Sequence, residues 1–138
     1  MTRSSAATPG GTLVLDSEGL AKAVLRDGTV TAWLALARAD DLRVITSAAT
    51  LVEVVHPHIN RPALEWTLSR LIVEPVTEPI ARQASVLLSN AGLHGHKSAV
   101  DAILGATALA APGPATVLTS GPEDLTALCG PRVTVVKI

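Results

Sequence analysis

Short apolar runs alternate with longer amphipathic segments along the chain. Five runs have the length and the aliphatic, β-branched content of buried strands, and they cover Thr12–Leu15, Arg43–Thr46, Leu71–Val76, Ala115–Thr119 and Arg132–Val136. Helical spacing of apolar positions is found between and after them, over Ser17–Arg26, Val30–Arg38, Ala48–His56, Ala63–Arg70, Glu78–Ala91, Ser98–Ala111 and Pro122–Leu128. Strands separated by helices need crossover connections. The pattern therefore predicts an α/β fold, a three-layer α/β/α sandwich around a mostly parallel sheet of about five strands.

The length of the chain and its turn residues agree with a single domain. The 138 residues are enough for one core, and Asp27-Gly28 and Pro112-Gly113-Pro114 fall between predicted elements, where the chain must reverse. The first residues, MTRSSAATPGG, contain no apolar stretch of the kind that a secretory signal needs. We predict a flexible tail over residues 1–11 and one domain over residues 12–138.

Composition limits the possible partners and cofactors. Hydrophobic residues make up 48% of a chain without Phe or Tyr, so Leu, Val, Ile and Ala must fill the core. The single cysteine, Cys129, excludes an internal disulfide, argues against a cysteine-based zinc site and is expected to be buried. The uncharged stretch Ala102–Pro122 is interrupted at Pro112, so we expect no membrane span and a cytoplasmic protein. At a net charge of -1, binding of a polyanion would need a local basic patch or a metal ion.

Three acidic residues interrupt apolar runs, where a charge needs a partner. They are Asp16 in LVLDS, Glu53 in TLVEVV and Asp101 in SAVDAILG. Asp16 has a structural alternative as a helix N-cap, and helical spacing alone places Glu53 on a solvated face. Asp101 lies at the edge of a buried stripe beside Gly105, where the missing side chain would admit another backbone or an ion.

Four segments in order resemble the motifs of PIN-domain nucleases, a family that includes VapC-type toxins of toxin–antitoxin pairs. They are LVLDSEGL, SAATLVEVV, GHKSAVDAILGATAL and VLTSGPEDLTAL, and they extend over nearly the whole predicted domain. The resemblance implies a Rossmann-like sandwich with acidic residues at the carboxyl ends of the central strands, binding Mg²⁺ or Mn²⁺ and cutting single-stranded RNA. By position, these residues would be Asp16, Glu53 and Asp101. It also implies a homodimer and an antitoxin protein as partner.

The physics of converging carboxylates is consistent with that assignment. Two like charges about 4 Å apart repel by roughly 4 kcal/mol at an effective dielectric constant near 20, so clustered carboxylates must share a cation or bind protons. A hard divalent cation with oxygen ligands removes the repulsion, polarises a phosphate and activates a water molecule.

The fourth segment departs from the family pattern at Gly121. Members usually carry an acidic residue after the hydroxyl pair, as in T-S-D-P-x-D-L, whereas this chain reads T-S-G-P-E-D-L. Asp124 could replace the missing ligand, but with Gly121 as N-cap and Pro122 at the first helical position it would instead serve the helix dipole. A capping box between Ser120 and Glu123 is a further alternative. We therefore expect the hydroxyls of Ser17, Thr119 and Ser120 to line the site.

Histidines and basic residues give less specific signals. The pairs His56/His58 and His94/His96 have a spacing that suggests a transition metal, but their loop-like context favours surface histidines. Arg61, His96 and Lys97 flank the acidic segments and could contact RNA, or could simply be solvated. The leucine-rich stripe in Ala48–Leu71 could bind a partner, although such faces more often belong to the core.

Three functions follow for testing. The leading hypothesis is a metal-dependent endoribonuclease that acts as the toxin of a toxin–antitoxin pair. The alternative is a degenerate PIN domain that binds RNA or an antitoxin with little or no cleavage, which the glycine at position 121 motivates. A third, an unrelated phosphotransfer or nucleotide-binding domain, lacks a G-x-G-x-x-G or P-loop pattern after any predicted strand.

Overall fold

Every predicted strand and helix is present in the structure, a computed structural model that describes residues 10–138. The strands are β1 (Thr12–Leu15), β2 (Arg43–Ser47), β3 (Ile72–Glu74), β4 (Ala115–Thr119) and β5 (Thr134–Lys137). The helices are α1 (Ser17–Val24), α2 (Gly28–Ala39), α3 (Ala48–Val54), α4 (Arg61–Leu68), α5 (Glu78–Ala91), α6 (Gly95–Ala110) and α7 (Pro122–Cys129), with a short 3-10 helix η2 (Gly130–Arg132). The period of the apolar positions therefore located the elements correctly.

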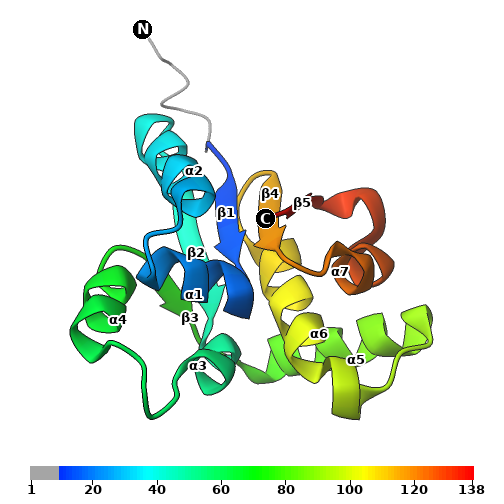
Figure 1. Cartoon of the computed structure of the whole chain (residues 1–138). Coiled ribbons are helices and arrows are strands. Elements are labelled where there is room, and N and C mark those ends of the chain that lie inside the picture. Colours follow the sequence, from blue (N-terminus) through cyan, green and yellow to red (C-terminus); the bar gives the residue numbers. More distant parts are fainter. Residues whose placement is uncertain (1–9) are drawn as a thin grey trace, which may run out of the picture.

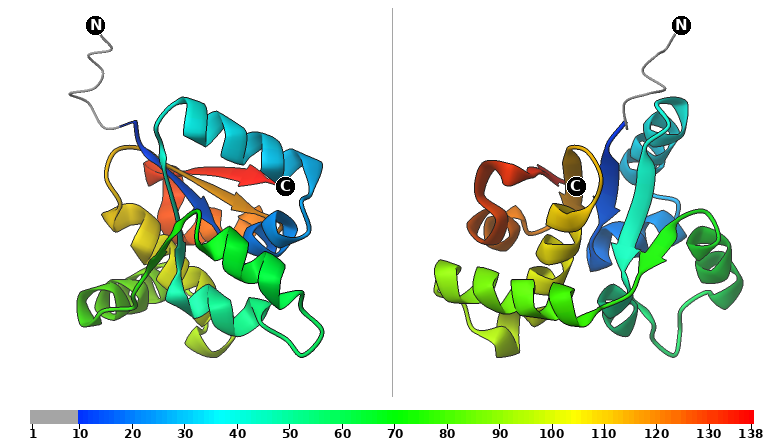
Figure 2. Two further views of the ribbon diagram at one scale, coloured as in Figure 1. Left: turned by 90° about the vertical axis from the view of Figure 1, so that its left-hand side faces the viewer. Right: turned by 180° about the vertical axis from the view of Figure 1, so that it is seen from behind.

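The strands form one sheet in the order β3-β2-β1-β4-β5, and all four pairings are parallel (Figure 1). One face packs against α5, α6 and α7 through Val14, Ile45 and Val117, which are fully buried. The other face packs against α1 and α2 through Leu13, Leu15 and Leu118. Figure 2 shows the sheet between these two helical layers. The predicted α/β/α sandwich is thus confirmed.

Polar side chains cap the helices that follow strands β1, β2 and β3. The Asp16 carboxylate accepts from the Gly19 N–H, the Ser47 hydroxyl from the Ala49 N–H, and the Thr77 hydroxyl from the Ile80 N–H. Each bond satisfies a backbone donor that the first helical turn leaves unpaired. Because β1 and β2 lead straight into α1 and α3, the first residues of both helices meet at the carboxyl edge of the sheet.

Most element boundaries differ from the prediction by one to three residues, and two of these differences have a clear local cause or bear on the site. Strand β3 ends at Glu74 instead of Val76, because Pro75 has no N–H to continue the ladder. Helix α6 begins at Gly95, three residues before the predicted start, and Ser98 has non-helical angles within it (φ -114°, ψ 15°). The segment that carries Asp101 is therefore the part of α6 after a kink.

Part of the predicted N-terminal tail belongs to the packed domain. Residues 1–9 lie outside the described part of the chain, but Gly11 is buried with a φ of 97°. A Cβ at that position would lie 2.6 Å from the Pro114 carbonyl oxygen, so only glycine fits there. Among the helices of the described residues, none has both the length and the apolar character needed to cross a membrane.

Candidate acidic site at the carboxyl edge of the sheet

Asp16 is held in place by the turn between β1 and α1. Its Oδ1 accepts from the Gly19 N–H at 2.7 Å, so the N-cap role that the sequence suggested is confirmed. Burial raises the pKa of Asp16, while hydrogen bonds from the Thr119 hydroxyl and the Gly19 N–H lower that pKa in part. A carboxylate has further lone pairs beyond the cap bond, so capping leaves Asp16 able to accept another ligand.

Asp101 lies half-buried on α6 in a strongly negative environment. Its pKa is raised to about 6, first by burial and then by the charges of Asp16, Asp124 and Glu53. These four acids come from the β1–α1 turn, α3, α6 and α7, so the fold gathers groups that are far apart in the sequence. Their shared field disfavours full ionisation, and a proton or a cation would relieve it.

Glu53 is exposed on α3, as its helical position predicted, but it has a specific partner. The Ser17 hydroxyl at the start of α1 donates to the Glu53 carboxylate. This contact fixes the Glu53 side chain toward α1 rather than toward bulk water. Ser17 therefore lies beside Glu53, one of the three acids that the sequence singled out.

The turn between β4 and α7 is built on Thr119 and Gly121. Gly121 is the N-cap of α7, Pro122 is its first residue, and Asp124 lies in its first turn, as one sequence alternative predicted. The Gly121 N–H donates to Thr119 Oγ1 at 3.0 Å. The predicted capping box between Ser120 and Glu123 is wrong, because α7 begins one residue later than such a box requires and Ser120 is exposed.

Gly105 does not open toward the acidic site. A Cβ there would lie 2.9 Å from the sulfur of Cys129 on α7, so the missing side chain makes room for that buried thiol. The expectation that Gly105 admits another backbone or an ion is therefore wrong, because the space is taken by side chains, the Cys129 thiol foremost. Cys129 is buried, as predicted.

The oxygen donors of the site are compatible with a Mg²⁺-type ion. Among residues 10–138, no three His, Cys, Asp or Glu side chains stand close enough together to enclose one ion. Charges influence one another over distances several ångströms longer than a metal–ligand bond. The other three acids can therefore shift the pKa of Asp101 without standing close enough to enclose an ion. Mg²⁺ typically uses one or two carboxylates and keeps several waters, so the donor set fits that ion better than a closed zinc site.

The basic residues and histidines singled out in the sequence all have exposed side chains. Arg61 opens α4, His96 and Lys97 lie in the first turn of α6, and no ion pair joins any of them to a site acid within residues 10–138. His56 and His58 are exposed, as predicted, and with Ser17 and Glu53 they line a cavity of about 330 Å³ beside α1 and α3.

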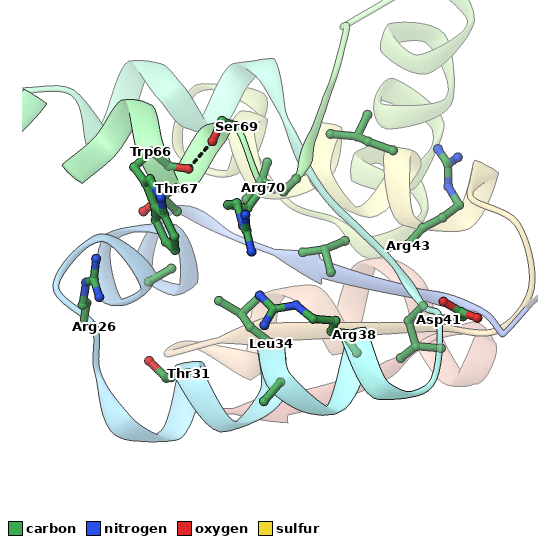
Figure 3. A pocket seen from close by; sticks show the side chains of 17 residues that line it. Arg26, Thr31, Leu34, Arg38, Asp41, Arg43, Trp66, Thr67, Ser69 and Arg70 are labelled. Carbon is green, nitrogen blue, oxygen red and sulfur yellow. Dashed lines mark hydrogen bonds between the residues drawn. The ribbon is translucent and has the colours of Figure 1, made fainter. Parts of the chain in front are cut away.

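A larger groove of about 630 Å³ lies away from the acids, between α2 and α4 (Figure 3). Arg26, Arg38, Arg43 and Arg70 surround it together with Trp66. This groove could not be recognised in the sequence, because its arginines lie on several elements and share no periodicity. The sequence indicated only that binding of a polyanion would need a local basic patch or a metal ion.

Comparison with known proteins identifies the fold. The fold is similar to that of a chain in the VapBC2 complex from Rickettsia felis, which was solved bound to a DNA fragment from the VapBC2 promoter. The TM-score is 0.68 and the sequence identity is 16%. The match covers 92% of this chain and 98% of that chain. No family model matches the sequence, and a comparison with curated proteins finds no similar sequence. The structural likeness confirms that the protein has a PIN-like α/β/α fold.

Proposed function

We propose that the chain is a Mg²⁺- or Mn²⁺-dependent endoribonuclease of the cytoplasm that cuts single-stranded RNA as the toxin of a toxin–antitoxin pair. The observation that supports it is the coupling of Asp101 to Asp16, Asp124 and Glu53 at the carboxyl edge of the sheet. Ligands of open parallel sheets bind at this edge. The likeness to a chain of the VapBC2 complex supports the same reading.

Asp16 and Asp101 would hold the ion, with Glu53 and Asp124 completing the negative field. Bound there, a divalent cation supplies an activated water and neutralises charge on the scissile phosphate. The chain itself supplies orientation: Gly19 and Thr119 hold Asp16, and Ser17 holds Glu53. The exposed hydroxyl of Ser120 and the side chains of Arg61, His96 and Lys97 would contact the RNA backbone.

Cleavage of labelled single-stranded RNAs tests this proposal directly. Wild type should cleave with Mn²⁺ or Mg²⁺ and stop with a chelator, and Asp101→Asn should lose roughly two orders of magnitude in rate because a ligand and its charge are gone. Glu65→Gln, an equivalent loss of charge on exposed α4, should cleave like the wild type. Equal cleavage by wild type and Asp101→Asn would refute the assignment.

Assembly with an antitoxin and with a second copy of the chain belongs to the same proposal. Helix α3 carries Val52, which is 83% exposed, within the stripe that the sequence suggested for a partner. Light scattering on the purified chain would show a dimer mass if the copies associate. A monomer at all concentrations would contradict the homodimer.

Gly121 supports a second candidate, a degenerate domain that binds RNA or an antitoxin without efficient cleavage. A Cβ at Gly121 would meet nothing within 4 Å among the described residues, and its φ of -124° is open to any residue. Gly121→Asp would therefore restore an acidic side chain without steric cost. Gly121→Asn is the matched control, since it caps α7 as well but adds no charge.

Titration calorimetry with Mn²⁺ separates the two candidates. A degenerate site should gain Mn²⁺ affinity and cleavage in Gly121→Asp but not in Gly121→Asn. A competent enzyme should bind Mn²⁺ and cleave RNA in the wild type, with little gain in either variant.

A further inference from the structure

The cavity of about 330 Å³ beside the acidic site is enclosed by α1, α3 and the loop that leads to α4 (Figure 1). Ser17 and Glu53 line it and also belong to the acidic site, so the two are continuous. Val24 and Val54 are buried and form its inner wall, and Ala21 lines it from α1. Its volume is at the lower end of the range for ligand cavities, about 300–1,000 Å³. The cavity therefore suits one small ring system and not a length of polypeptide.

Two exposed histidines line this cavity on a loop that is held in place. His56 and His58 flank Pro57, and the Ile59 N–H donates to the His56 carbonyl oxygen at 3.1 Å, which closes a tight turn. Ile59 is partly buried and packs against the core that α1, α3 and α4 share. The His58 N–H donates to His56 Nδ1 at 3.2 Å, so the hydrogen of the neutral His56 ring is on Nε2. The turn therefore presents a ring with a defined donor.

The charge of the cavity favours an uncharged group that carries N–H donors. Glu18 and Glu53 are its charged lining residues, and among the described residues no Arg or Lys lines it. Glu53 already accepts from Ser17, whereas Glu18 forms no ion pair within residues 10–138. Both carboxylates would repel a phosphate, but an uncharged donor would gain a hydrogen bond to a charged acceptor.

We propose that this cavity binds one nucleobase of the RNA strand that is cut at the acidic site, with guanine preferred. The proposal rests on the proposed function, because it takes RNA as the ligand. Guanine presents two adjacent donors, N1–H and the N2 amino group, which match the two oxygens of the Glu18 carboxylate. Its O6 and N7 are acceptors for the Nε2–H of His56. Uracil has a single N–H donor on its pairing edge, so it would leave one oxygen of Glu18 without a partner.

The composition of the chain makes histidine the ring that is available for stacking here. Bases of single-stranded RNA are commonly stacked on Phe, Tyr, Trp or His side chains. The chain has no Phe or Tyr, and its two tryptophans line other hollows of the surface, Trp66 between α2 and α4 and Trp33 on α2. The His56/His58 pair, whose spacing suggested a transition metal, would instead hold a base.

A metal ion and a cationic side chain of a partner protein are the competing occupants. Among residues 10–138, no three His, Cys, Asp or Glu side chains stand close enough to enclose one ion, which argues against the metal. A lysine or arginine would pair with Glu18, but both side chains are donors only. The Nε2–H of His56 would then have no acceptor, whereas guanine supplies one.

Titration with free nucleosides, followed by NMR of the histidine rings, tests the cavity on the full chain without metal or cleavage. The chain has only four histidines, so their ring signals can be assigned one by one. Guanosine at millimolar concentration should shift the signals of His56 and His58 and leave those of His94 and His96 unchanged. Inosine, which is guanosine without the N2 amino group, should bind about fivefold more weakly, and uridine more weakly still.

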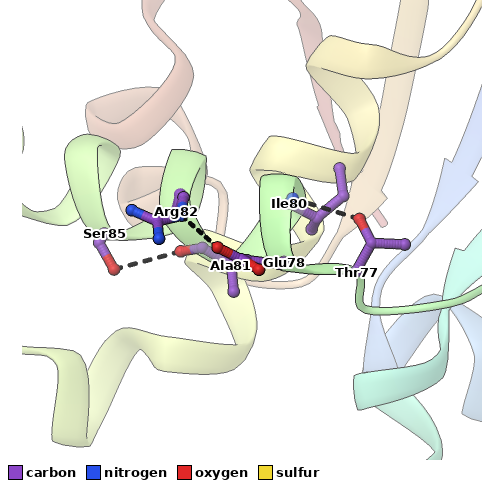
Figure 4. A network of polar contacts seen from close by, with 6 residues as sticks. All are labelled: Thr77, Glu78, Ile80, Ala81, Arg82 and Ser85. Atoms are coloured by element: carbon purple, nitrogen blue, oxygen red, sulfur yellow. Dashed lines mark hydrogen bonds and ion pairs between the residues drawn. The ribbon is translucent and has the colours of Figure 1, made fainter.

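Replacing Glu18 by glutamine separates recognition of guanine from general binding. Glutamine has nearly the same size but one acceptor oxygen and no charge, so the preference for guanosine over inosine should fall below about twofold. Glu123→Gln is the matched control, since Glu123 occupies the same second position of α7 and lies outside the cavity. Glu78→Gln is a remote control on α5, where Glu78 pairs with Arg82 at 2.7 Å (Figure 4). Both controls should bind guanosine like the wild type.

Filling the cavity provides a second matched pair. Ala21 lines the cavity from α1, and Ala32 lies outside it on α2. Ala21→Trp should abolish the response to guanosine, and Ala32→Trp should leave it unchanged. Glu18 is exposed, so Glu18→Gln remains decisive if Ala21→Trp does not fold.

Cleavage assays connect the cavity to the reaction. Two RNA substrates would differ only in one nucleoside next to the cleaved bond, guanosine or inosine. Wild type should cut the inosine substrate with kcat/KM about fivefold lower. Glu18→Gln should cut both substrates equally.

Three results would overturn the proposal. One is guanosine that leaves the His56 and His58 signals of folded wild type unchanged, and another is equal binding of guanosine and uridine. The third is a stronger response to N-acetyl-arginine amide than to guanosine that is lost in Ala21→Trp, which would assign the cavity to a side chain of a partner protein. Failure of the nuclease proposal would appear separately, as absent cleavage of every RNA with guanosine binding intact.

Discussion

Replacing Asp101 by asparagine should stabilise the metal-free protein at neutral and higher pH. Asp101 lies half-buried beside Asp16, Asp124 and Glu53, and its pKa is raised to about 6 by burial and by those charges. Asparagine has nearly the same shape and no charge, so it removes the repulsion without opening a cavity. Residues whose replacement stabilises the protein are typical of functional sites.

The size of the effect follows from the difference in proton affinity between folded and unfolded chains. A pKa of about 6 against the ordinary value of 3.8 corresponds to about 3 kcal/mol. Asp101 is partly exposed, and water screens its charge, so about 1–2 kcal/mol is the expected gain. The folded chain binds the proton more tightly than the unfolded chain, so wild type loses stability as the pH rises from about 4 to about 6.

Urea denaturation in a chelating buffer at several pH values measures this difference. Asp101→Asn should be more stable than wild type at about pH 8 and nearly equal to it at about pH 4, where the aspartate is protonated in the folded state. Glu65→Gln, on the exposed surface, should stay within about 0.5 kcal/mol of wild type at both. Adding Mn²⁺ should raise the stability of wild type and not that of Asp101→Asn.

An Asp101→Asn variant that is less stable than wild type at about pH 8 would contradict the inferred repulsion among the acids. A gain that does not shrink as the pH falls would refute it equally, because the benefit would then come from packing and not from charge. In either case the four acids would not form a mutually repelling cluster.

Further substitutions test the packing and the caps by urea denaturation. Gly105→Ala should lower the free energy of unfolding by about 1–3 kcal/mol, because its Cβ would lie 2.9 Å from the Cys129 sulfur, and Cys129→Ala in the same chain should recover much of the loss. Asp16→Ala should cost about 1 kcal/mol through loss of the α1 cap, whereas Asp16→Asn should keep the cap. Arg43→Ala should cost less than about 1 kcal/mol, since its ion pair with Glu74 is partly exposed and screened by water.

Periodicity was sufficient to predict the fold because each element carries its own signal. Asp16 marks the start of α1 by capping chemistry that is local to the sequence. Pro75 ends β3 for a reason that is equally local, although the predicted strand Leu71–Val76 continued past it. Strand alternation puts Leu13 and Val14 on opposite faces of the sheet, and in the structure they belong to the cores on those two faces. Such rules act within a few residues, so one sequence contains them.

Contacts between distant segments could not be predicted in the same way. Gly105 faces Cys129 because α6 packs on α7, and the sequence offers no sign of which helix face receives a neighbour. The arginine groove depends on Arg26, Arg38 and Arg70, which end different segments and converge only after α2 and α4 are placed. The sequence could therefore suggest which acids to examine, but not where the cations gather.

Gly121 has a defined role in the turn after β4, but that role does not require a glycine. Its N–H donates to the Thr119 hydroxyl, and the Thr119 hydroxyl in turn lowers the pKa of Asp16, so the turn after β4 supports an acid after β1. The backbone makes this connection, and any residue with an N–H would make it too. Because a Cβ at position 121 is free of contacts with the described residues, packing did not require the glycine.

An added carboxylate there would join a field that already holds Asp101 partly protonated near neutral pH, which costs stability unless a cation binds. Under the proposed function the glycine would reduce repulsion among the site acids, and the Gly121→Asp and Gly121→Asn pair measures whether an added charge at this position changes metal affinity.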